Sequence, residues 1–165
     1  MKKILTLLLC AALLPLLAGC DGSDDVAEIF TGKTWKLTYI ALEGQHQWVD
    51  FWDGDEAARQ RSMKELEKSA TFTVTFQGSE AEGVVGGEFE AQAINGRTTG
   101  YWSADGGSRE LSTTNIRTTG SDTDALARAF TAGLRNARRY SGDSQNLYIY
   151  YEDGQTTKCM AFHIQ

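Results

Sequence analysis

Apolar and polar residues alternate along most of the chain from Phe30 onward, and this pattern predicts a mainly β structure. The clearest case is Phe72, Val74 and Phe76, which alternate with threonines as in a half-buried strand. The same alternation, together with aromatic and β-branched residues, predicts further strands at 35–39, 48–52, 89–93, from 101, at 111–116, at 147–151 and at 158–164.

Turn-forming residues separate several of these expected strands. Asn95-Gly96 is typical of a type I′ hairpin turn, and Asp153-Gly154 lies between the last two strands. Three glycines ahead of Phe89 predict a turn or bulges there: Gly83, Gly86 and Gly87.

Two segments have the composition and spacing of helices. Leu126, Phe130 and Leu134 recur on one face and predict a helix over 122–139 that packs on the sheet. The segment 55–69 is charged and has only a modest apolar face, so it predicts a surface helix. We therefore expect an α+β domain. It would be a strongly bent antiparallel β-sheet or partly open barrel of about seven or eight strands, with one packed helix and one surface helix.

The first twenty residues have the features of a secretory signal. Lys2 and Lys3 precede a short apolar stretch over 4–17, which ends in small residues and Cys20. The tetrad Leu17-Ala18-Gly19-Cys20 resembles the lipobox of bacterial lipoproteins. That resemblance implies cleavage before Cys20, a lipid on its sulfur and an acyl chain on its new amino terminus. The expected organisation is a signal peptide over 1–19, a lipidated acidic tether over 20–29 and a β-rich domain over 30–165.

The net charge of the chain limits the classes of molecule that it can bind. The chain has a formal net charge of −6, and loss of Lys2 and Lys3 with a signal peptide would leave −8. A nucleic-acid partner is excluded on this ground, because a phosphate-binding surface needs clustered cations. The membrane link is expected to be the covalent lipid on Cys20, since an acidic domain gains nothing from anionic lipid.

The acidic residues that follow Cys20 bear on location. Asp24 and Asp25 resemble the acidic run that, in one large group of Gram-negative bacteria, directs lipoproteins to the cell surface. In enteric bacteria, by contrast, Asp directly after the lipidated cysteine favours the inner membrane. We expect the cell envelope, with the outer membrane and its external face favoured. A plain solvated linker explains the same residues equally well.

The three cysteines offer no intramolecular disulfide. Cys10 would leave with the signal peptide, Cys20 would carry lipid, and Cys159 would remain alone. We expect Cys159 to be a buried small hydrophobic residue rather than a reactive thiol.

Catalytic and metal-binding motifs are missing from the sequence. His163 and Cys159 would lie about 13 Å apart along one strand, too far to share an ion. The acidic cluster around Asp53 and Asp55 lacks the spacing of a calcium loop and is better explained as a turn that caps the next helix. We expect no cofactor, no metal and no enzymatic activity.

Aromatic residues are the remaining candidates for recognition. Trp48 and Trp52 lie beside a polar turn, so we expect them to be exposed and to contact a ligand or partner. Core packing is the alternative explanation, and it is the more common role of such residues.

The order of hydrophobic anchors resembles the META/HslJ-like domain. The matching segments are Gly32-Lys33-Thr34-Trp35-Lys36-Leu37, Phe72-Thr73-Val74-Thr75-Phe76, Gly86-Gly87 with Phe89, the strand 111–116, Thr118-Thr119, Phe130, Leu134, Tyr140, Leu147-Tyr148-Ile149-Tyr150 and Met160-Ala161-Phe162. The resemblance implies a compact antiparallel β structure with one helix. It also implies an envelope lipoprotein that binds an unknown protein or small molecule, or that serves envelope maintenance without catalysis.

A second resemblance leaves an alternative open. Gly32 and Trp35 are similar to the Gly-x-Trp motif in the first strand of lipocalins. This implies a barrel that binds a small ligand or glycan in an internal cavity. A hydrolase is the third and least supported hypothesis, because nearby carboxylates such as Asp50 and Asp53 are no evidence of a catalytic pair.

Overall fold

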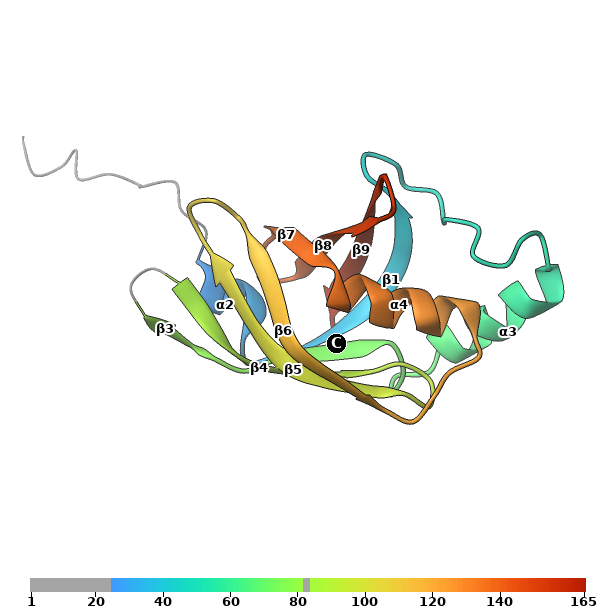
Figure 1. Cartoon of the computed structure of the whole chain (residues 1–165), viewed down its shortest axis with the longest axis horizontal. Helices are drawn as coiled ribbons and strands as arrows, with labels where there is room; N and C mark the ends of the chain where they lie inside the picture. Colours follow the sequence, from blue (N-terminus) through green and yellow to red (C-terminus); the bar gives the residue numbers. More distant parts are fainter. Residues whose placement is uncertain (1–24, 82–83) are drawn as a thin grey trace, which may run out of the picture.

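The computed structural model describes residues 25–81 and 84–165 (Figure 1). The expected signal peptide, Cys10, Cys20 and Gly83 lie outside these described residues. The described elements are α2 (Val26–Phe30), β1 (Thr34–Leu42), α3 (Glu56–Leu66), β2 (Thr73–Phe76), β3 (Ser79–Ala81), β4 (Val84–Gln92), β5 (Arg97–Asp105), β6 (Leu111–Thr119), α4 (Ala125–Arg135), β7 (Ala137–Gly142), β8 (Asn146–Asp153) and β9 (Thr156–Ile164).

The strands form one bent antiparallel sheet. Their order is β6-β5-β4-β2-β1-β9-β8-β7, and the short β3 adds to β4. The sheet curves until its end strands approach, where Glu110 bridges to Arg139 and the Tyr140 N–H donates to the Arg109 carbonyl. It does not close, so the predicted α+β class with a bent open sheet is confirmed. Within the described residues the sheet has nine strands instead of seven or eight, because β3 and β7 were not predicted as strands.

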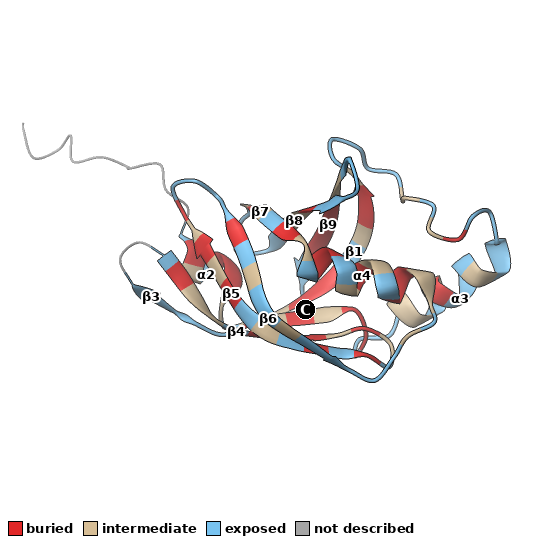
Figure 2. Ribbon diagram, viewed as in Figure 1, coloured by how far each residue is buried: buried red, intermediate tan, exposed pale blue. Residues whose placement is uncertain are grey.

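Buried residues occur in both halves of the sheet (Figure 2), and their side chains form one hydrophobic core. Trp35, Leu37, Val74 and Phe76 are buried, as their alternation with polar residues predicts. The largest fully buried side chains include Trp35, Tyr140, Tyr151, Phe30, Phe72, Phe76, Phe130 and Phe162. Aromatic rings thus occupy the space that a ligand cavity would need.

Helix α4 covers the open side of the sheet between β6 and β7 (Figure 1). Asp124 caps its first turn by accepting from the Ala127 N–H, and Leu126, Phe130 and Leu134 are buried. The Phe130 ring packs against Phe72 and Phe162, with centroids 5.7 and 6.3 Å away. The helix ends at Arg135 rather than 139, because the chain from Ala137 pairs with β8.

Helix α3 lies on the surface as predicted, and the Asp55 side chain caps it by accepting from the Ala58 N–H. The expected strand at 48–52 is not formed; Trp48 makes only an isolated bridge to Ala41. The reason is Asp50, whose carboxylate accepts from the backbone N–H groups two and four residues later and so folds this segment into a turn.

The folded domain begins earlier than the expected boundary at residue 30. Helix α2 starts at Val26, and Val26, Ile29 and Phe30 are buried. The Phe30 ring stacks on Trp102 with centroids 4.7 Å apart and meets Phe76 and Tyr140 edge-on. Residues that were expected to belong to the tether therefore fill one end of the core. Helices α2 and α3 lie at opposite ends of the molecule (Figure 1).

The β4–β5 hairpin is present, but its turn is not type I′. That turn needs positive φ at both central residues, and neither Asn95 nor Gly96 has it. The turn is held instead by the Asp122 carboxylate, which accepts from both of these backbone N–H groups at 2.9 and 2.8 Å. A distant carboxylate therefore supplies the stabilisation that local turn geometry was expected to give.

Gly86 and Gly87 lie within β4 rather than in a turn. The chain between β2 and β3 crosses them so closely that a Cβ at Gly87 would lie 2.1 Å from the Gln77 carbonyl oxygen. Close backbone approach explains these glycines. In the described part of the chain, no helix is both long and apolar enough to cross a bilayer.

Candidate functional site

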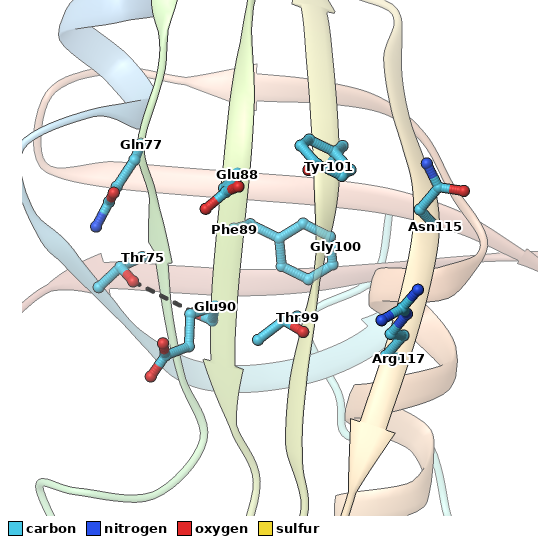
Figure 3. A pocket seen from close by; sticks show the side chains of 10 residues that line it. All are labelled: Thr75, Gln77, Glu88, Phe89, Glu90, Thr99, Gly100, Tyr101, Asn115 and Arg117. Atoms are coloured by element: carbon cyan, nitrogen blue, oxygen red, sulfur yellow. Dashed lines mark hydrogen bonds between the residues drawn. The ribbon is translucent and has the colours of Figure 1, made fainter.

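The outer face of β2, β4, β5 and β6 presents two rows of polar side chains (Figure 3). Strand register places Glu88 beside Tyr101, and Glu90 beside Thr99. One row contains Gln77, Glu88, Tyr101 and Asn115, and the other contains Thr75, Glu90, Thr99 and Arg117. Alternation puts the intervening Phe89 on the opposite, buried face.

A bulge interrupts the β5–β6 ladder in the middle of this face. Thr99 pairs with Arg117 and Tyr101 with Thr114, so Gly100 alone faces both Asn115 and Ile116. Asn115 has φ of +51°, in the left-handed region, as bulges often require. The bulge turns Asn115 outward beside Tyr101 (Figure 3).

Gly100 is required at this bulge. A Cβ there would lie 2.8 Å from both the Phe89 ring and the Thr114 carbonyl oxygen. The Phe89 ring thus packs where a side chain at position 100 would stand. The outer surface is hollowed over Gly100, and we call this concavity of about 560 Å³ the sheet-face hollow; it is lined by Thr75, Gln77, Glu88, Phe89, Glu90, Thr99, Gly100, Tyr101, Asn115 and Arg117.

Tyr101 is the large apolar side chain of the sheet-face hollow that reaches solvent. Its exposed fraction is 48%, whereas Phe89 is 2% exposed. Ring exposure of this extent on a sheet face leaves an aromatic surface free for contact with a ligand.

Charges in the sheet-face hollow are mixed. Glu90 pairs with Arg97, and both are about half exposed, so this ion pair adds little stability. Arg117 pairs with no carboxylate in the described part of the chain. Glu88 and Glu90 are solvent-exposed, so their carboxylates offer hydrogen-bond acceptors to a ligand.

The structure brings Trp48 and Trp52 together, with ring centroids 6.3 Å apart. Trp52 is buried, 6% exposed, contrary to the exposure that we expected for it. Its indole N–H donates to Ser62 Oγ at 2.8 Å, and that hydroxyl donates to Asp124 Oδ2 at 2.6 Å. Trp52 therefore joins α3 to the start of α4, a structural role.

Trp48 is only partly buried and lies beside a small surface hollow of about 230 Å³. A larger hollow of about 580 Å³ separates α3 from α4 and has Trp52 in its wall. Its rim contains acidic and basic side chains in similar number, including Asp53, Arg61 and Arg128. The carboxylates of Asp55 and Asp124 are engaged as helix caps. Its aromatic side chains, Phe51 and Trp52, are half-buried and buried, so this second hollow offers a ligand no exposed ring.

The histidines and acidic turn bring no metal ligands together. His163 Nδ1 lies 2.9 Å from Thr38 Oγ1. Across residues 25–81 and 84–165, no three His, Cys, Asp or Glu side chains form a group that would hold an ion. Cys159 is buried, as expected, and burial raises its pKa to about 11.

The sheet-face hollow was not predicted from the sequence, because the register of neighbouring strands and a bulge create it. Most of its residues are polar and come from four different strands, so each of these resembles an ordinary solvent-facing position. One local signal existed: Gly100 and Asn115 are poor strand formers within two otherwise regular strands.

Comparisons with known proteins place the chain in a family. A family model described as "Domain of unknown function (DUF4847)" matches residues 21–164. A crystal structure of a DUF4847 family protein from Bacteroides vulgatus ATCC 8482 is similar with a TM-score of 0.59 and 25% identity. The similarity covers 84% of this chain and 96% of that chain. No curated protein matches.

These findings correct the expected META/HslJ resemblance. The matching hydrophobic anchors reflect the general alternation of a bent antiparallel sheet, which unrelated β families share. The family match and the structural neighbour agree with each other, and neither is a META/HslJ domain. The chain belongs to the DUF4847 family.

Proposed function

We propose that this chain is a lipid-anchored protein of the cell envelope that acts without catalysis, as a binding module, through its sheet-face hollow. The observation that carries the binding proposal is the bulge at Gly100 and Asn115. A left-handed residue inside a strand disturbs the ladder, and such local departures are common where a side chain is aimed at a ligand.

The filled interior favours surface recognition over the lipocalin-like alternative. Phe30, Trp35 and Phe130 are each at most 1% exposed and fill the space inside the sheet. A ligand the size of those that lipocalins carry would have to displace several of these rings. The sheet-face hollow needs no such rearrangement, because it is already open to solvent.

The envelope location is supported by the N-terminal sequence. The lipobox-like tetrad ends at Cys20, and the acidic residues that follow resemble a surface-sorting signal. A lipid anchor also suits a module with an acidic surface, because such a surface has no electrostatic attraction to anionic membranes.

The binding proposal is tested by photo-cross-linking in the native cell. Tyr101 is replaced by p-benzoylphenylalanine in the full chain, and Ile164 is replaced in a matched control. Ile164 is similarly exposed, at 42%, but does not line the sheet-face hollow. We expect a light-dependent adduct at position 101 and none at 164. The absence of an adduct at 101, or equal adducts at both positions, would contradict the proposal.

A further inference from the structure

The chemistry of the sheet-face hollow points to a neutral oligosaccharide as its ligand. We infer this class from the arrangement of its polar groups, its one exposed aromatic ring and its balance of charge. The inference rests on the proposed function, because it identifies what the same surface binds.

The two rows combine donors and acceptors within one surface. Asn115 and Gln77 offer amide groups, Arg117 offers guanidinium N–H donors, and Glu88 and Glu90 offer carboxylate acceptors. A sugar hydroxyl donates one hydrogen bond and accepts others, so a polyhydroxylated ligand can satisfy both kinds of group at once. Charged partners make these hydrogen bonds stronger than neutral ones.

Tyr101 supplies the apolar part of such a site. It stands in the same row as Glu88 and Asn115, so an aromatic ring lies between a hydrogen-bond acceptor and an amide (Figure 3). Pyranose rings present C–H groups on one face and hydroxyls around their edge. An aromatic ring flanked by polar groups matches both surfaces, and a rigid ring loses little entropy on contact.

The charge balance selects a neutral ligand. An anion that approached Arg117 would meet Glu88 and Glu90, and a cation that approached the glutamates would meet Arg117. Arg97 completes this balance, because it pairs with Glu90 and leaves the charge of Glu88 to offset that of Arg117. A neutral ligand avoids both repulsions.

A protein partner fits this surface less well. Stable protein interfaces have an apolar, desolvated centre surrounded by a polar rim. The sheet-face hollow has the reverse pattern, with polar groups throughout and one exposed ring. Its volume of about 560 Å³ lies within the usual range of small-ligand sites.

The test is isothermal titration calorimetry with the detergent-solubilised full chain. The probes are five neutral hexasaccharides (cellohexaose, maltohexaose, mannohexaose, xylohexaose and hexa-N-acetylchitohexaose) and, as an anionic comparison, hexagalacturonate. We expect saturable binding of at least one neutral probe and weaker binding of the anionic one. No saturable binding of any neutral probe, or tighter binding of hexagalacturonate, would overturn the inference.

Variants connect this binding to the sheet-face hollow. Tyr101→Ala is expected to weaken binding of the responsive probe about tenfold, and Tyr101→Phe is expected to stay within about threefold because it keeps the ring. Asn115→Gly keeps the left-handed backbone and removes the amide, so it is expected to weaken binding several-fold. Ile164→Ala is the control and should leave the affinity unchanged. Equal affinities for Tyr101→Ala and the unmodified chain would overturn the inference.

The two experiments separate the two proposals. An adduct at position 101 without saccharide binding would support the proposal of a binding module but reject an oligosaccharide as its ligand. Digestion of that adduct with a protease would then identify a protein partner. Absence of both the adduct and saccharide binding would reject both proposals.

Discussion

Single glycines decide whether the strands around the sheet-face hollow can approach one another. A Cβ at Gly87 would lie 2.1 Å from the Gln77 carbonyl oxygen and 2.7 Å from the Gly78 Cα. These are backbone atoms, so relief would require two chain segments to separate. Gly87 has no positive φ, so the requirement for glycine here is steric rather than conformational.

Gly87→Ala is therefore expected to lower the free energy of unfolding by about 1–3 kcal/mol. Gly107→Ala is the matched control, because its Cβ would meet only the Asp105 carboxylate at 3.4 Å. Denaturant unfolding of both variants measures the difference. Equal stability of the two variants would show that β4 and the crossing segment separate without cost.

Cys159 is expected to make the fold sensitive to alkaline pH. Burial raises the pKa of its thiol from about 9 to about 11, so the folded protein keeps a proton that the unfolded chain releases. The contribution of the protonated Cys159 thiol to the free energy of unfolding is complete below pH 9 and is lost as the pH rises through 11. The loss amounts to at most about 3 kcal/mol.

Measurement of the free energy of unfolding between pH 9 and 11 tests this. Cys159→Ala should flatten the decline, but some decline should remain because burial also raises the pKa of Tyr151. An unchanged slope in Cys159→Ala would contradict the expected linkage.

At the scale of elements, α4 stabilises the domain by covering the open side of the sheet. Phe130 is 1% exposed and lies between Phe72 of the β2 side and Phe162 of the β9 side. Its removal would leave a cavity inside the bend of the sheet, where buried side chains from both of its halves pack together. Phe130→Ala is expected to cost about 3–5 kcal/mol in the free energy of unfolding.

Arg128→Ala on the exposed face of the same helix is the control for Phe130→Ala, and it should change stability by less than about 0.5 kcal/mol. Thermal and denaturant unfolding would report both. A cost below about 1 kcal/mol for Phe130→Ala would mean that α4 contributes little to the core.

Element prediction succeeded where the physical cause was local. Alternation at Phe72, Val74 and Phe76 reflects a buried and an exposed face of one strand, and the sequence carries that information directly. The failure at 48–52 has a local cause that was overlooked, since Asp50 favours a turn. The error at Ala137–Gly142 has a tertiary cause. The arginines there suit the end of a helix, but this segment forms a strand because it pairs with the edge of β8.

At the scale of the whole molecule, the candidate site depends on contacts between distant segments. A strand was predicted from residue 101, but the position of Tyr101 beside Asn115 follows from strand register across a bulge. The predicted pair, Trp48 and Trp52, lie close together, but Trp52 is buried and its indole N–H donates to Ser62. Sequence pattern predicts which residues share an element, and only the fold decides which elements share a surface.

The whole-molecule arrangement also bears on anchoring. Among the described residues, the core begins at Val26, which belongs to a helix whose Phe30 fills one end of the core. Cys20→Ala is therefore expected to move the protein from the membrane fraction to the soluble fraction and to leave its thermal unfolding unchanged. Cys159→Ala, which removes the other cysteine downstream of the signal, should leave it in the membrane fraction. If Cys20→Ala still sediments with membranes after a high-salt wash, the anchor is not the lipid on Cys20. The folded domain itself would then have to bind the membrane, despite its acidic surface.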